Sequence, residues 1–234
     1  MSRLRPFWRY YGGKWRAAPR YPKPTHPVVV EPFAGAAGYA MAHHRCNVVL
    51  VEKYPVVAGI WRFLIAARAA EILRIPEVEA VADLPSWVPQ EARWLVGFCL
   101  NAAVVSPCNV LSAGRRRLRA MGRRYEGWNA AHRNSVACGV EEIKHWRIIE
   151  GDYTLAPDLQ ATWFVDPPYN NRQGSYYPHG PSGLDYADLE AWVRARRGQV
   201  MVCENEGATW LPFRPFGTFK AGVNGKGSRE VIWP

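Results

Sequence analysis

The sequence predicts an α/β protein whose mostly parallel sheet carries helices on both faces. Three short apolar runs, at residues 28–30, 48–51 and 163–165, have the length and composition of buried strands. Longer segments at 55–74 and 185–197 place apolar residues at helical spacing and alternate with these runs. Strands that alternate with helices form parallel sheets covered on both faces, so the order of the segments predicts this class.

The first half of the chain supplies the start of the sheet. Residues 1–27 are basic, aromatic and rich in proline, which indicates a loop or an arm. The strand at 28–30 runs into a glycine-rich turn at 31–40 that opens a helix, and the strand at 48–51 runs into the helix at 55–74. Three prolines at 76–89 mark a joint before the arginine-rich segment 90–145.

The second half completes the sheet. Residues 147–150 and 163–165 are expected to be strands, and 170–184 a polar loop with glycine and proline. Asp185 is a candidate cap for the helix at 185–197. Further strands are expected at 200–203 and 229–233.

We expect three parts: 1–84 with the arm and the cofactor-binding half, a basic helical insertion at 85–146, and 147–234 with the rest of the main domain.

Composition indicates a folded, basic protein. The chain has 234 residues, 48% of them hydrophobic, which suits one elaborated domain and excludes a disordered tail. The formal net charge of +10 favours a polyanionic partner, with nucleic acid first. A protein that is merely basic is the alternative.

The cysteine pattern and the N-terminal residues indicate in which cellular compartment the protein is expected. Five cysteines are scattered without a CxxC pair, which argues against a structural zinc site and fits the reduced thiols of a cytoplasm. The N-terminus lacks the apolar core of a signal peptide, and no window approaches the ~18 apolar residues of a membrane span. We therefore expect a cytoplasmic protein with no metal and no membrane partner.

Acidic residues follow several of the expected strands. They are Glu31, Glu52, Asp152 and Asp166, with Glu204 and Asn205 after a later strand. In open α/β sheets, ligands bind at the carboxyl ends of the strands. The sequence therefore predicts a binding site formed by these side chains.

The turn Glu-Pro-Phe-Ala-Gly-Ala-Ala-Gly at 31–38 lets the backbone approach a ligand closely. It is neither GxGxxG nor a phosphate loop, and Glu31 suits a cationic group better than a pyrophosphate. Glu52, 21 residues later, can accept both hydroxyls of a ribose. Together they favour an adenosine-type ligand with a cationic end, such as S-adenosylmethionine. A tight turn without a ligand is the alternative.

The segment Asp166-Pro-Pro-Tyr169 ends a strand with an acid and two rigid residues. Asp166 and the carbonyl of Pro167 can each accept one N–H bond from an exocyclic amine, which turns the nitrogen lone pair towards an electrophile. Tyr169 can stack on the base, a contact that contributes ~1–3 kcal/mol. Such an amine is reached only if the nucleotide is flipped out of a duplex. The alternative is a rigid loop without chemistry.

The middle of the chain concentrates arginine. The candidate DNA-binding residues are Arg115, Arg116, Arg117, Arg119, Arg123, Arg124 and Arg133. Guanidinium groups bind phosphates and also guanine edges in the major groove. A solvated basic helix face is the alternative interpretation.

The sequence resembles the Dam-type DNA-adenine N6-methyltransferases. The segments that carry the resemblance are Tyr-Tyr-Gly-Gly-Lys-Trp at 10–15, the turn at 31–38, Glu52 and the segment 166–169. Asp152 and the segment 229–233 are weaker matches. In order and spacing these cover nearly the whole chain except the middle. The residues from Asn170 onward and the alanine-rich helix after the turn depart from the family pattern.

The resemblance implies a role for each matching residue. Tyr10 and Lys14 would line the methionine end of the cofactor, with Lys14 at its carboxylate. Glu31, Phe33, Gly35 and Gly38 would surround the methionine and the ribose. Glu52 would bind the ribose hydroxyls and Asp152 the adenine amine, while Asp166 and Tyr169 would hold the target base. It also implies a Rossmann-like methyltransferase fold with an inserted target-recognition region.

The expected function is methyl transfer from S-adenosylmethionine to the N6 amine of adenine in double-stranded DNA, with base flipping and S-adenosylhomocysteine as product. The resemblance to the compact Dam-type enzymes implies a solitary enzyme of a bacterium or phage-infected cell. We expect a monomer, with a dimer as the alternative. Cytosine N4 methylation, an RNA substrate and a non-catalytic DNA-binding relative are the competing hypotheses.

Overall fold

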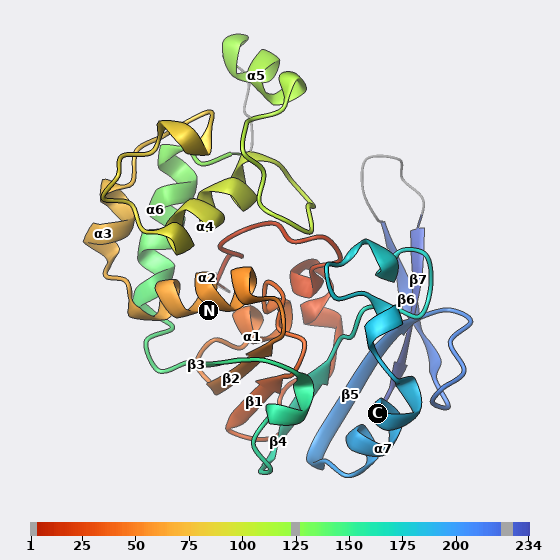
Figure 1. The fold of residues 1–234 in the computed structure, drawn as a ribbon. Helices are drawn as coiled ribbons and strands as arrows, with labels where there is room; N and C mark the ends of the chain where they lie inside the picture. The colour runs from red at the N-terminus through yellow and green to blue at the C-terminus, as the bar shows by residue number, and fades with distance from the viewer. Residues whose placement is uncertain (1–3, 123–126, 221–226) are drawn as a thin grey trace.

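The computed structural model describes residues 4–122, 127–220 and 227–234, which form an α/β fold around a seven-stranded sheet (Figure 1). The strands are β1 (Val28–Glu31), β2 (Asn47–Glu52), β3 (Arg147–Glu150), β4 (Gln160–Val165), β5 (Arg197–Asn205), β6 (Arg214–Lys220) and β7 (Gly227–Trp233). Their order is β3-β2-β1-β4-β5-β7-β6. The pairs among β1 to β5 are parallel and β7 is antiparallel to both β5 and β6, so the expected mostly parallel sheet is confirmed.

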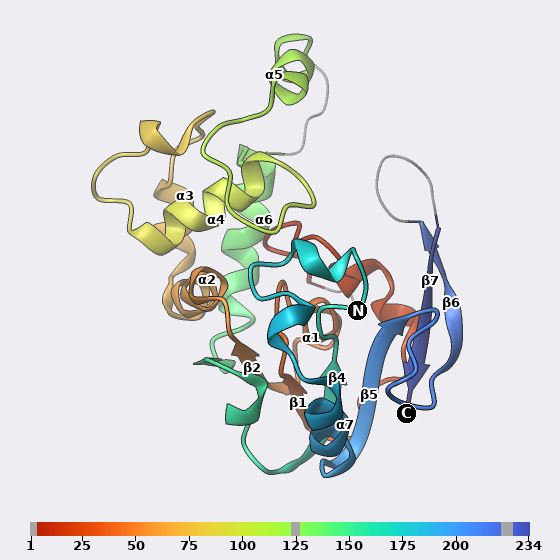
Figure 2. The same ribbon diagram turned by 45° about the vertical axis from the view of Figure 1, so that its right-hand side comes forward.

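Helices pack on both faces of the sheet (Figure 2). They are α1 (Gly38–Ala42), α2 (Pro55–Ala66), α3 (Ala69–Arg74), α4 (Gln90–Leu100), α5 (Ala113–Ala120), α6 (Ala130–Glu141) and α7 (Tyr186–Arg194). Phe164 of β4 packs in the cluster that contains α1 and α2, whereas its neighbours Trp163 and Val165 pack with α7. Successive strand residues point to opposite faces, so a continuous apolar run is buried on both.

The strand order reverses between β1 and β4. The chain moves outward from β1 through β2 to β3, and then returns to place β4 on the other side of β1. Such a switch point leaves a crevice outside the carboxyl ends of the two central strands, where ligands bind in open α/β sheets. The segment that ends in Asp166 and the turn that starts at Glu31 therefore meet at one place.

The single helix expected at 55–74 is two helices, because the backbone becomes extended at Ala67. Contacts from α6 and the residues after it stabilise the extended backbone between α2 and α3. Lys144 donates to the carbonyl of Ala67, and Glu141 accepts from the first amide of α3 at 2.9 Å. No glycine or proline marks the break in the sequence, so tertiary contacts here override helical propensity.

The C-terminal part has a shorter helix and one more strand than expected. Asp185 caps α7 as predicted, accepting from the amide of Ala187 at 2.8 Å, but the helix ends at Arg194 and Arg197 already belongs to β5. Strand β6 was not expected, because its proline and glycine argue against a strand. It lies at the edge of the sheet, where a missing backbone donor is tolerated.

From residue 4 onward, the arm before β1 packs into the core. It contains 3₁₀ helices at Lys14–Arg16 and Ala18–Arg20. Trp8 is fully buried, and its ring centroid lies 5.1 Å from that of Trp61 in α2. This anchor carries the segment 10–15 to the carboxyl ends of the central strands.

The middle of the chain lies beside α2 and α3. Helix α4 packs on α2 and α6 packs on α3, while α5 projects beyond them (Figures 1 and 2). Within the described residues, no helix has the length and apolar character needed to cross a membrane.

Candidate active site

A pocket lies at the carboxyl ends of β1, β2 and β4. Every residue expected to contact the cofactor lines it: Tyr10, Lys14, Glu31, Phe33, Gly35, Gly38, Glu52, Asp152 and Asp166. The arm and the loop 170–184, far apart in sequence, meet over it, drawn in red and cyan in Figure 1. There the Tyr177 hydroxyl donates to the carbonyl of Tyr11 at 2.9 Å.

The glycine-rich turn is shaped by close backbone packing. Gly35 has φ +45°, and a Cβ there would lie 3.1 Å from the ring of Tyr10. A Cβ on Gly38 would lie 2.5 Å from the backbone nitrogen of Trp15, so the arm rests directly on the start of α1. Ala37 between them has φ +48°, a conformation costly for a residue with a side chain. Strain of this kind is typical of functional turns.

Glu31 is buried beneath this turn with 2% of its surface exposed. Its carboxylate accepts from the amide of Ala40 at 2.5 Å, in the first turn of α1. Burial raises the pKa of Glu31 from 4.5 to about 8, although the hydrogen bond from Ala40 opposes the shift. A cationic group brought beside Glu31 would favour its ionised form.

Glu52 is held in place by three backbone amides. One oxygen accepts from Gly35 at 2.8 Å and the other from Tyr54 at 2.9 Å. The amide of Lys53 also hydrogen-bonds to this carboxylate, whose two oxygens together offer about four acceptor sites. The three amides therefore leave acceptor capacity free. Burial raises the pKa of Glu52, and the amides of Tyr54, Gly35 and Lys53 oppose that rise.

Asp152 and Phe33 also line the pocket. Asp152 caps the 3₁₀ helix at Tyr153–Leu155 and pairs with Lys53 at 3.1 Å. The rings of Phe33 and Tyr153 stack with centroids 5.4 Å apart. A flat apolar group would find here both an aromatic surface and a carboxylate acceptor for an amine.

Asp166 has a cationic partner from the arm. The Lys14 ammonium lies 2.9 Å from Asp166 Oδ1 and 4.8 Å from the ring centroid of Tyr169. Burial raises the pKa of Asp166, and Lys14 opposes the rise. Lys14 lines the pocket as expected for a residue near the cofactor, and in this structure its ammonium group pairs with Asp166.

A hydrogen bond from α7 and the burial of a proline hold the rest of the segment 166–169 in place. The Tyr186 hydroxyl of α7 donates to the carbonyl of Pro168 at 2.5 Å, while Pro167 is buried. Asp166 and Pro168 line the pocket, whereas Pro167 and Tyr169 do not. The two prolines and Tyr186 therefore limit the movement of Asp166.

Sequence reasoning missed several groups near Asp166. Glu230 of β7 lies 3.7 Å from the Lys14 ammonium, and Tyr21 donates to Glu230 at 2.7 Å. Tyr177 and His179 line the pocket from the loop 170–184. The only signal for Glu230 was its place in the segment 229–233, which was interpreted as a strand. Its proximity to Lys14 depends on the antiparallel pairing of β7 with β5.

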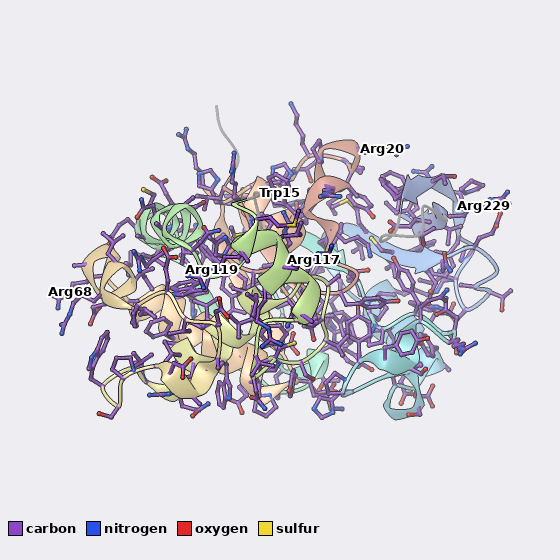
Figure 3. All side chains as sticks on the ribbon, turned by 90° about the horizontal axis from the view of Figure 1, so that it is seen from above. Trp15, Arg20, Arg68, Arg117, Arg119 and Arg229 are labelled. Atoms are coloured by element: carbon purple, nitrogen blue, oxygen red, sulfur yellow. The ribbon has the colours of Figure 1, made fainter. Side chains whose placement is uncertain are left out.

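The arginines of α5 have different surroundings. Arg116 and Arg117 are exposed, and Arg115 is partly buried. Arg119 pairs with Glu79 at 2.7 Å. Figure 3 looks down on α5 with Arg117 and Arg119, and shows Arg68 at the opposite margin from Arg229.

The other candidate DNA-binding arginines are not all on this helix. Arg133 lies on α6, where its guanidinium donates to the carbonyl of Ile75 at 2.8 Å beyond the end of α3. This contact gives Arg133 a structural partner. Arg123 and Arg124 lie outside the described residues.

Comparison with known proteins finds no matching family model and no significant match among curated proteins. Any functional assignment therefore rests on the geometry of the pocket. In the described part of the chain, no three His, Cys, Asp or Glu side chains gather as metal ligands.

Proposed function

We propose that the protein is an S-adenosylmethionine-dependent methyltransferase that methylates the N6 amine of adenine in double-stranded DNA. The observation that carries the proposal is the pocket at the switch point, lined by the glycine-rich turn, Glu52 and Asp166. The order β3-β2-β1-β4-β5 is that of doubly wound nucleotide-binding sheets, which supports a Rossmann-like fold. The antiparallel β7 departs from the wholly parallel form.

The residues of the pocket fit the cofactor by their chemistry. Glu52 can accept from the ribose hydroxyls with the acceptor capacity that its three backbone amides leave free. Asp152 can accept from the adenine amine, with the stacked rings of Phe33 and Tyr153 beside it. Glu31 suits the ammonium group of the methionine end. When bound, the cofactor supplies an activated methyl group on a positively charged sulfur.

The chain itself orients the acceptor. Asp166 accepts one N–H of the target amine and the carbonyl of Pro167 accepts the other, so the nitrogen lone pair faces the methyl group. Lys14 covers one face of the Tyr169 ring, so a flipped base would stack on the opposite face. Positioning supplies most of the rate enhancement, because the methyl group is already activated.

Basic residues supply the expected DNA contact. Arg116 and Arg117 on the projecting α5 are exposed and suit phosphate binding. We assign Arg133 a smaller contribution, since it donates to a backbone carbonyl. The inserted region would then act as the target-recognition part of the enzyme.

The test is the product formed on duplex DNA. Unmethylated plasmid is incubated with the protein and S-adenosylmethionine, digested to nucleosides and analysed by mass spectrometry. We expect N6-methyladenine with the wild type and none with Asp166→Asn. If N4-methylcytosine formed instead, the protein would be a cytosine N4-methyltransferase. If only an RNA sample became methylated, the substrate would be RNA and not DNA. DNA binding without any methylated product would support a non-catalytic protein.

A further inference from the structure

Four buried or partly buried polar groups form a chain that reaches the pocket lining at Lys14 and Asp166. The Tyr21 hydroxyl donates to Glu230 at 2.7 Å, and the other oxygen of Glu230 lies 3.7 Å from the Lys14 ammonium. Lys14 in turn lies 2.9 Å from Asp166. The side chains of Lys14 and Glu230 are 7% and 9% exposed, so water screens this chain poorly.

The chain holds two carboxylates and one ammonium group, and its net charge is therefore negative. Lys14 and Asp166 alone would form a neutral pair, in which the carboxylate is a weaker acceptor for an amine hydrogen. Burying an additional carboxylate costs free energy, and an apolar side chain on β7 would avoid that cost. The position of Glu230 therefore points to an electrostatic role at Asp166.

We propose that Glu230 is a positioning residue, which shares Lys14 with Asp166 and so keeps a net negative charge beside the acceptor amine. The inference rests on the proposed function. As the nitrogen–carbon bond forms and the carbon–sulfur bond breaks, the positive charge passes from sulfur to the amine nitrogen. The nitrogen then loses one proton, which Asp166 accepts and releases to water. Fixed negative charge where this positive charge develops lowers the barrier.

Glu230 is one of several groups that act on Asp166. The others are Lys14 and Tyr21 from the arm, Glu31 from β1, Tyr169 from the same loop, Cys203 and Glu204 from β5, and Tyr177 from the loop 170–184. Burial is the main reason that the pKa of Asp166 is raised, and the negative charge of Glu230 raises it further. Removing that charge must therefore move the ionisation of Asp166 to lower pH.

The first test follows the pH dependence of DNA methylation in Glu230→Gln. We expect the maximal rate to fall about tenfold or more and the acid limb of the profile to move to lower pH. Glu230→Asp should restore the position of the limb. Glu206→Gln is the matched control, because Glu206 is an exposed acid on a neighbouring segment that pairs with Arg229. A slower Glu230→Gln enzyme with an unmoved limb would reduce Glu230 to a packing role and overturn the proposal.

The second test needs no cofactor. The melting temperature of the wild type, Glu230→Gln, Asp166→Asn and the double variant is measured as a function of pH, which gives a double-mutant cycle. We expect the effect of Glu230→Gln on the acidic part of the profile to shrink when Asp166 is already neutral. Additive effects would overturn the coupling. If the coupling appears but the wild type forms no methylated nucleoside, the proposed function fails while the charge relationship stands.

Discussion

The Lys14 ammonium lies 2.9 Å from Asp166 Oδ1, so a residue of the N-terminal arm is the counter-ion of the acid that ends β4. Burial alone would lower the pKa of Lys14, but its neighbours Asp166, Tyr169 and Glu230 together outweigh burial and hold the pKa well above its usual value. Lys14 is therefore charged over the whole range in which the protein would work. The arm is held to the sheet by this ion pair as well as by its aromatic residues.

Replacing this lysine should destabilise the fold. Lys14→Met leaves the buried Glu230 and the partly buried Asp166 without their cation, and such a loss costs about 3–5 kcal/mol. Lys23→Met, at an exposed position of the same arm, should change the free energy of unfolding by less than about 0.5 kcal/mol. Urea unfolding followed by tryptophan fluorescence measures both. Equal stability of the two variants would contradict the counter-ion role.

Asp166→Ala should separate catalysis from cofactor binding. The variant removes an acceptor of the target amine but leaves Glu52 and the glycine-rich turn intact, so methylation should fall at least about a hundredfold. Binding of S-adenosylmethionine, measured by calorimetry, should change by less than about tenfold. Asp158→Ala, at an exposed acid remote from the pocket lining, is the control. Abolished cofactor binding would mean that Asp166 holds the cofactor and not the base.

A triple variant tests the projecting helix. Replacing Arg115, Arg116 and Arg117 with alanine should weaken DNA binding and reduce the slope of log K against log salt by about two, since each phosphate contact contributes about 0.9. The partial burial of Arg115 is the reason for expecting less than the full value for three contacts. Fluorescence anisotropy of a labelled duplex at several salt concentrations measures the slope.

The control for this experiment removes the same charge elsewhere. Arg62, Arg68 and Arg194 lie on or beside α2, α3 and α7, and each has an acidic partner. Their triple alanine variant should leave the slope nearly unchanged. If both triple variants lower it equally, net charge and not α5 determines the affinity.

Gly38→Ala tests the packing of the arm on the glycine-rich turn. The new Cβ would lie 2.5 Å from the backbone nitrogen of Trp15, and backbone atoms cannot move aside without shifting Lys14. We expect a loss of about 1–3 kcal/mol in the free energy of unfolding together with weaker cofactor binding. Gly114→Ala in α5 is the matched control, since a Cβ there meets nothing within 4 Å. A stable Gly38→Ala protein would show that this contact is not restrictive.

The central strands and the strand-end acids Glu52 and Asp166 were predictable from local patterns, whereas only the resemblance placed Tyr10 and Lys14 at the site. Buried parallel strands are continuous apolar runs, and their ends fix where Glu52 and Asp166 lie. The end of α2 was not predictable in this way, because it depends on Lys144, which is distant in sequence. The same is true of Glu230, whose contact with Lys14 exists only once β7 pairs with β5. Local sequence patterns were therefore enough to predict where the pocket lies. The charged groups that surround Asp166 could be identified only from the folded structure.

Glu31 should give the protein a measurable pH dependence of stability. Its pKa rises from 4.5 to about 8 on folding because the carboxyl group is buried, so the folded state binds the proton more tightly than the unfolded state. This contribution is fully present below about pH 4.5 and is lost as the pH rises through about 8.

Glu31→Gln keeps an oxygen for the amide of Ala40 but cannot ionise. We therefore expect the melting temperature of this variant, relative to the wild type, to increase steadily as the pH rises through that window. Glu206→Gln, at an exposed acid, should show no such trend. Differential scanning calorimetry at a series of pH values measures all three proteins. Parallel profiles for Glu31→Gln and the wild type would mean that Glu31 has the same pKa in the folded and unfolded states. A partner within the fold would then offset the cost of burying its charge.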